Sequence, residues 1–150
     1  MPMANWTRQA LIEAPVHDVW DLVGDPNRHP EWFPLVLAVS GLPRVEADAT
    51  YVQVSRTPGR PRETSFLIEE LDDLREIGVR CTDTGTYTRF LLTSAREDTF
   101  AEIEIGFEPT GLMMRAFDAA VGKRYCKRWT EDALAGLRAA VERAPAAPTT

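Results

Sequence analysis

The sequence predicts an α+β fold in which a curved antiparallel sheet of seven strands wraps around a long C-terminal helix. Three observations carry this prediction. Residues 110–143 contain no proline and many strong helix formers. Residues 35–108 hold six runs of alternating, β-branched or aromatic side chains and show no helical period. Two short helical segments lie between the first strand and these six runs.

The chain begins with a predicted strand at residues 6–13, followed by two short helices. Pro15 suits the first turn of a helix, and Gly24 is expected to end that helix with a positive φ. Asp25 can cap a second short helix that starts at Pro26 and is bounded by Pro34. The apolar residues of the first helix fall at i, i+3, i+4 and i+7, namely Val16, Val19, Trp20 and Val23.

The six further strands are separated by short turns of the kind found in antiparallel hairpins. They are expected at residues 35–40, 50–56, 64–71, 75–82, 86–94 and 99–108. The last of them has the clearest faces, because Ala101, Ile103, Ile105 and Phe107 alternate with Glu102, Glu104 and Glu108. One face is therefore expected to be buried under the C-terminal helix and the other to face water.

The C-terminal helix carries two apolar stripes on nearly opposite sides. The first stripe consists of Met113, Met114, Phe117, Ala120 and Val121. The second consists of Cys126, Thr130, Ala133, Leu134, Leu137 and Val141. A straight helix cannot bury both stripes in one core, so we predict a kink or bulge between Gly122 and Lys127.

Composition places the chain among ordinary globular proteins. With 150 residues, 44% hydrophobic and 27% charged, a single domain at residues 1–143 is expected, followed by a disordered tail at 144–150. No run approaches the length of a membrane span and no signal peptide is visible, which predicts a cytoplasmic protein without integral membrane association. Cys81 and Cys126 are expected to be reduced core thiols. The net charge of −6 argues against nucleic-acid binding.

The opening of the chain resembles the START-like, or helix-grip (Bet v 1-like), superfamily, specifically its bacterial polyketide cyclase/dehydrase and lipid-transport branch. The residues that carry the resemblance are Ile12, Glu13, Ala14, Pro15, Val19, Trp20, Asp25, Pro26, Pro30, Trp32 and Pro34. The match in the order of strands and helices covers nearly the whole chain. It implies an elongated apolar cavity between the sheet and the long helix.

We expect the inward side chains of the strands and of the helix to line this cavity. The lining is predicted as Val52, Val54, Phe66, Ile77, Val79, Ile103, Ile105, Phe107, Phe117, Val121 and Tyr125. Further ligand contacts are predicted from Trp32, Phe33, Phe90 and Met114. The alternatives are a filled core, in which the methionines simply pack, and an aromatic pair that closes the edge of the domain.

Four polar residues are candidates for chemistry inside such a cavity: His29, Tyr87, Arg89 and Tyr125. His29 could carry a proton near neutral pH, although a single histidine in a loop is more often at the surface. Tyr87 and Arg89 share one strand face, for which the outward orientation is favoured. No motif indicates a metal, a cofactor or a phosphate loop.

Three functions remain open at this point. The first is binding of a hydrophobic or aromatic small molecule, lipid or polyketide-like, by a monomer or homodimer. The second is a polyketide aromatase/cyclase or dehydratase that acts in the same cavity. The third is a module that docks a protein or a membrane. Convergence of two or more candidate polar side chains on one point of the cavity would favour chemistry, and an apolar wall would favour binding.

Overall fold

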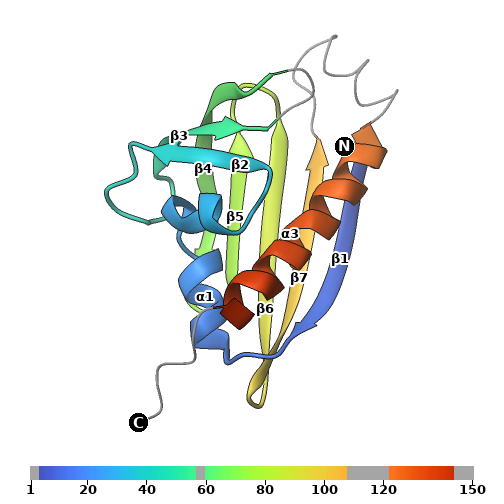
Figure 1. The fold of residues 1–150 in the computed structure, drawn as a ribbon. Helices are drawn as coiled ribbons and strands as arrows, with labels where there is room; N and C mark the ends of the chain where they lie inside the picture. Colours follow the sequence, from blue (N-terminus) through green and yellow to red (C-terminus); the bar gives the residue numbers. More distant parts are fainter. Residues whose placement is uncertain (1–3, 57–59, 108–121, 144–150) are drawn as a thin grey trace.

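The computed structural model describes residues 4–56, 60–107 and 122–143. Its strands form one antiparallel sheet of seven, in the order β1-β7-β6-β5-β4-β3-β2 (Figure 1). The strands are β1 (Ala4–Ile12), β2 (Val36–Ser40), β3 (Thr50–Ser55), β4 (Arg62–Asp72), β5 (Glu76–Cys81), β6 (Thr86–Ala95) and β7 (Asp98–Phe107). The predicted seven-stranded sheet, with two short helices after its first strand, is confirmed.

The short helices follow β1, as the sequence predicts. They are α1 (Val16–Val23) and the 3-10 helix η1 (Pro26–Glu31). Asp25 caps η1, because its Oδ1 accepts a hydrogen bond from the Asn27 backbone N–H at 2.9 Å. Gly24 differs from the expectation, since its φ is −78°. The close approach of Trp20 explains the glycine, because a Cβ at this position would lie 2.3 Å from the indole.

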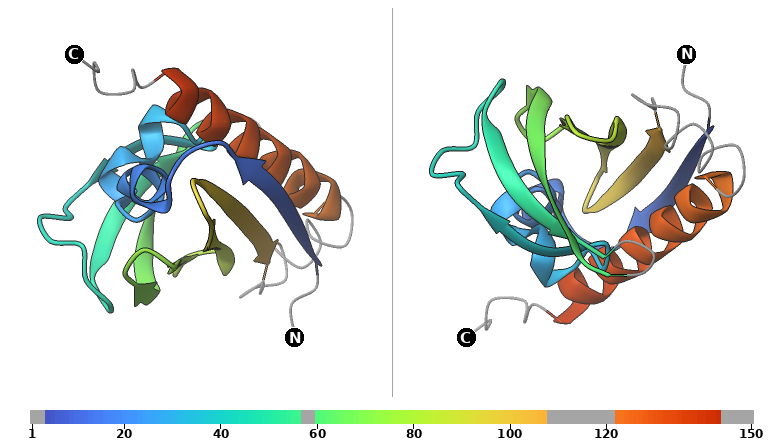
Figure 2. Two further views of the ribbon diagram at one scale, coloured as in Figure 1. Left: turned by 90° about the horizontal axis from the view of Figure 1, so that it is seen from below. Right: turned by 90° about the horizontal axis from the view of Figure 1, so that it is seen from above.

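The C-terminal helix α3 (Lys123–Arg143) crosses the concave side of the sheet diagonally over β7 and β1 (Figures 1 and 2). Arg8 of β1 pairs with Glu131 of α3, and Arg138 donates to the Leu11 carbonyl oxygen at 2.9 Å. The second predicted stripe faces the core in most of its residues: Cys126, Thr130, Ala133, Leu134 and Leu137 are buried, and Val141 is partly buried.

The first predicted stripe, Met113, Met114, Phe117, Ala120 and Val121, lies outside the described residues, as does the tail at 144–150. Gly122, the first described residue of this region, is buried and has a π-helical backbone pattern. Such turns often accompany kinks. The bend itself depends on the residues before Gly122 and stays a prediction.

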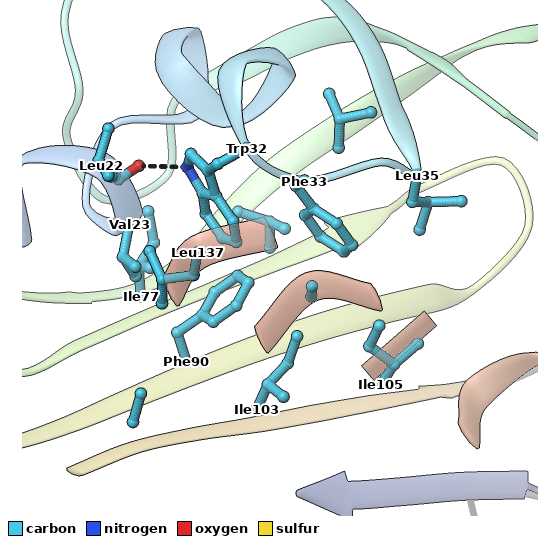
Figure 3. Close-up of a cluster of buried hydrophobic side chains, with 14 of the residues drawn as sticks. Leu22, Val23, Trp32, Phe33, Leu35, Ile77, Phe90, Ile103, Ile105 and Leu137 are labelled. Carbon is cyan, nitrogen blue, oxygen red and sulfur yellow. Dashed lines mark hydrogen bonds between the residues drawn. The ribbon is translucent and has the colours of Figure 1, made fainter. Parts of the chain in front are cut away.

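Under α3 the sheet forms a closely packed core. Ile103 and Ile105 of β7 are fully buried there, together with Leu137 of α3. Figure 3 shows Ile103 and Ile105 on the same side of their strand, and Leu137 beside Ile77 in the same cluster of buried hydrophobic side chains. The alternation of the two β7 isoleucines with Glu102 and Glu104, which lie on the other face, confirms the predicted faces of β7.

Candidate functional site

A cavity of about 980 Å³ lies between the β3 to β6 part of the sheet and the η1 region. The described residues that line it come from nearly every element of this half of the fold. They are His29, Phe33, Leu35, Val36, Gln53, Ser55, Arg60, Pro61, Arg62, Glu63, Thr64, Phe66, Val79, Cys81, Thr84, Thr86, Thr88, Phe90, Phe107 and Trp129. Arg60, Arg62 and Glu63 are exposed, so the cavity opens at the β3–β4 end.

The position of the cavity follows from where α3 lies. Within the described residues, α3 packs mainly on β1 and β7, with fewer contacts to α1, and no extensive contact between α3 and β3, β4 or β5 is seen there. Ile103 and Ile105, predicted as lining, are instead buried in the packed part and do not reach the cavity. Ile77 is likewise fully buried beside Val23 and Leu137, away from the lining (Figure 3). These three residues differ from the prediction because their side chains are buried in the packed core and are not part of the described lining.

One end of the cavity is aromatic. The ring centroids of Phe33 and Phe90 lie 6.0 Å apart at 84°, and Trp32 stacks on Phe33 at 5.4 Å. Trp32 does not line the cavity itself, contrary to the prediction, because its indole lies under the short helices and donates from Nε1 to the Leu22 carbonyl oxygen at 3.0 Å (Figure 3). Trp32 therefore packs against Phe33 without lining the cavity itself.

His29 lies in this aromatic end and is buried, with 1% of its surface exposed. Its ring stands edge-on to Trp32, Phe33 and Phe90. Its Nε2 is 2.9 Å from the Val23 carbonyl oxygen, which can only accept, so Nε2 carries the proton. Burial lowers the pKa of His29 to about 4, although the Val23 hydrogen bond and the Asp25 charge act in the opposite direction. The imidazole is therefore neutral at neutral pH.

The other end of the cavity is polar, and here the sequence prediction was wrong. On β3 it is Tyr51, Gln53 and Ser55 that are buried, while Val52 and Val54 lie half-buried on the opposite face. The register explains the reversal, because Tyr51 pairs with Phe66 of β4 and stacks on its ring at 5.6 Å. This stack fixes the inward face, and period-2 alternation then places the two polar residues inside.

Tyr87 and Arg89 lie on the outer face of the sheet. The Tyr87 hydroxyl donates to Glu104 Oε2 at 2.7 Å, and Arg89 pairs with Glu76 at 2.6 Å. Tyr125 does not line the cavity either; its ring contacts that of Trp129 at 5.3 Å, and Trp129 is the lining residue. Of the four candidates for chemistry, the structure places only His29 at the cavity.

The predicted ligand contacts divide into three groups. Phe33, Phe66, Val79, Phe90 and Phe107 do line the cavity. Trp32, Val54, Ile103, Ile105 and Tyr125 do not. Met114, Phe117 and Val121 lie outside the described residues. Sequence reasoning missed Gln53, Ser55 and Thr88, because it sought apolar side chains for the inner face.

Comparison with known proteins is decisive for the family. The family model for polyketide cyclase / dehydrase and lipid transport matches residues 3–142.

The chain belongs to this family. The START-like, helix-grip resemblance is thereby confirmed. No curated protein matches the chain.

Solved structures show the same fold at low sequence identity. A START superfamily protein from Mycobacterium smegmatis aligns with a TM-score of 0.73 and 15% identity, over 92% of this chain and 97% of the other. The Zhui aromatase/cyclase from a Streptomyces species aligns with a TM-score of 0.74 and 16% identity, over 93% of each chain. A protein from Thermus thermophilus aligns with a TM-score of 0.75 and 16% identity, over 94% of this chain and 99% of the other.

Two properties of the described residues concern membranes and metals. Among the helices of residues 4–56, 60–107 and 122–143, none is long and apolar enough to cross a membrane. Within the same ranges, no group of three or more His, Cys, Asp or Glu side chains could hold a metal ion.

Proposed function

We propose that this chain binds a hydrophobic or aromatic small molecule, lipid or polyketide-like, in the cavity between its sheet and helices. The observation that carries the proposal is the volume of about 980 Å³ with an aromatic inner end. Pockets for small molecules typically measure ~300–1,000 Å³ and are lined mainly by apolar and aromatic groups with a few polar ones. The family description, which names both cyclase/dehydrase and lipid transport, supports the same ligand class.

Binding is favoured over catalysis by the way the polar candidates are distributed. A general base works best when its pKa lies near the working pH, whereas burial holds the pKa of His29 at about 4. Tyr87 and Arg89 bond to carboxylates on the far side of the sheet. The aromatase/cyclase or dehydratase alternative would need a base and a carbonyl-polarising donor at one point, and His29 alone does not supply both. We also keep the predicted cytoplasmic location as part of the proposal.

The test uses a neutral apolar fluorophore, N-phenyl-1-naphthylamine, together with native mass spectrometry for co-purified ligand. Thr88 is buried in the cavity wall between Val79 and Ile105 in the strand register. The larger side chain in Thr88→Trp should occupy part of the cavity and weaken binding of the fluorophore at least about tenfold. Thr93→Trp, on the exposed face of the same strand, is the matched control and should bind as the wild type does. Absence of binding to the wild type, or equal loss in both variants, would overturn the proposal.

A further inference from the structure

The cavity wall changes in polarity from its inner end to its mouth along two paired strands. The cross-strand pairs on the inner face are Tyr51 with Phe66, then Gln53 with Thr64, then Ser55 with Arg62. Directly opposed side chains in an antiparallel pair have Cβ atoms roughly 4.5–5.5 Å apart. The last two pairs therefore form one block of four polar side chains, and all four line the cavity.

Two members of this polar block are buried and use only part of their hydrogen-bonding capacity. Gln53 and Ser55 are 3% and 7% exposed, and Gln53 Nε2 donates to Ser55 Oγ at 2.9 Å. Each amide side chain offers two N–H donors and an acceptor oxygen, and a serine hydroxyl keeps its own proton when it accepts. Both residues line the cavity, so the second N–H of Gln53 and the hydroxyl proton of Ser55 are available to a ligand bound there.

Arg62 adds a positive charge at the mouth. It is exposed, and none of the ion pairs seen in the described part of the chain includes it. Arg60 also lies on the rim but already has an interaction partner. Glu63, the one acidic side chain of the lining among the described residues, alternates with Arg62 and Thr64 along β4 and lies exposed on the rim, outside the block of four. A guanidinium beside amide and hydroxyl donors matches the oxygens of an anionic group.

We infer that the ligand is amphipathic, with an oxyanion head, such as a carboxylate, bound by Arg62, Gln53, Ser55 and Thr64, and an apolar body that extends toward Phe33 and Phe90. This inference rests on the proposed function and adds the orientation and charge of the ligand. A purely apolar ligand would leave the donors of Gln53 and Ser55 unpaired in a desolvated site, which is unfavourable. A cationic head would meet the guanidinium of Arg62.

The experiment compares two probes that differ by one anionic group: N-phenyl-1-naphthylamine and its 8-sulfonate. Arg62→Gln should weaken binding of the sulfonate probe about tenfold, and Gln53→Leu should weaken it about fivefold, since a charge-assisted hydrogen bond is lost in each case. Both variants should bind the neutral probe within twofold of the wild type. Arg44→Gln, an exposed arginine that does not line the cavity, controls for the change in net charge and should alter neither probe.

A competition experiment then tests whether the anionic group must be attached to an apolar chain. Dodecanoate should displace the sulfonate probe, while methyl dodecanoate and inorganic sulfate at equal concentration should displace it much less. Equal displacement by sulfate would mean that the block binds free anions, and would overturn the amphipathic ligand. Equal effects of Arg62→Gln on both probes would overturn the anionic head and leave the proposed function standing. If neither probe binds the wild type, the proposed function fails and this inference fails with it.

Discussion

Acidification should destabilise this protein through one residue, His29. Burial lowers its pKa from the ordinary 6.5 to about 4, while the unfolded chain exposes the imidazole to water. Between these two values the unfolded chain binds the proton and the folded chain does not. The free energy of unfolding therefore falls as the pH drops from about 6.5 to about 4, and the contribution of His29 changes no further below that. Above the window, its contribution is fully present.

The magnitude follows from the two pKa values. Their difference, at ~1.36 kcal/mol for each pKa unit, corresponds to about 3 kcal/mol. That is a large part of the ~5–15 kcal/mol by which domains are stable. The effect is large because the carbonyl oxygen of Val23 and the charge of Asp25 offset only part of the penalty for placing an imidazolium among aromatic rings.

Urea unfolding at a series of pH values measures this contribution. His29→Gln keeps an N–H that can donate toward the Val23 carbonyl and removes the titration. The difference in free energy of unfolding between wild type and His29→Gln should shrink by about 3 kcal/mol on going from neutral pH to pH ~4. His17→Gln, at an exposed site on α1, is the control and should follow the wild type. Parallel curves for wild type and His29→Gln would refute the reasoning.

Three further predictions concern packing. Gly136→Ala should lower the free energy of unfolding by about 1–3 kcal/mol, because a Cβ there would lie 2.0 Å from the Trp32 carbonyl oxygen; exposed Ala135→Gly, which loses only ~1 kcal/mol of helix propensity, is the control. A stabilised Gly136→Ala variant would contradict the close approach. Tyr51→Phe should stabilise the protein by about 1 kcal/mol in urea unfolding, because it removes a sealed hydroxyl without a partner, and a loss of stability would point to an unseen partner. Gly122→Ala should weaken binding of N-phenyl-1-naphthylamine more than it lowers stability, because it favours a straight helix, and equal losses would speak against a functional bend.

Strands with one wet and one buried face could be predicted from the sequence down to the orientation of single residues. In β7 the glutamates mark the outer face, so Ile103 and Ile105 had to point inward. The prediction failed one step later, at what these residues face. Whether an inward side chain meets a helix or an open cavity depends on the path of α3 over the sheet, and no local pattern encodes that path.

Strand β3 was assigned the wrong face for a different reason. Its valines alternate with polar residues, and hydrophobicity alone places Val52 and Val54 inside. The structure reverses this, because the Tyr51 ring stacks on Phe66 and fixes the register. The available signal was Tyr51 itself, which is larger than either valine and is in phase with Gln53 and Ser55.

His29 shows how an environment can override the statistics of a residue type. A histidine between Arg28 and Pro30 suggests a surface loop, yet Asp25 caps a 3-10 turn that carries the imidazole inward. Arg28 of the same turn points to solvent and pairs with Glu31 at 3.0 Å. A single helical turn thus holds an exposed charged side chain next to a buried neutral one. In the sequence, only the capping residue Asp25 indicated this turn.

The reversed face of β3 bears on what the cavity is for. Filling the inner face with Val52 and Val54 would have stabilised the fold, whereas Gln53 and Ser55 bury polar groups whose hydrogen bonds the protein satisfies only in part. A purely structural residue in this position should lose stability when it is replaced. Gln53→Leu should instead leave the fold as stable or more so and weaken only the anionic probe. A substitution that maintains or raises the free energy of unfolding but lowers affinity for the anionic probe is expected if Gln53 is retained for recognition. It is not expected if Gln53 only fills the core.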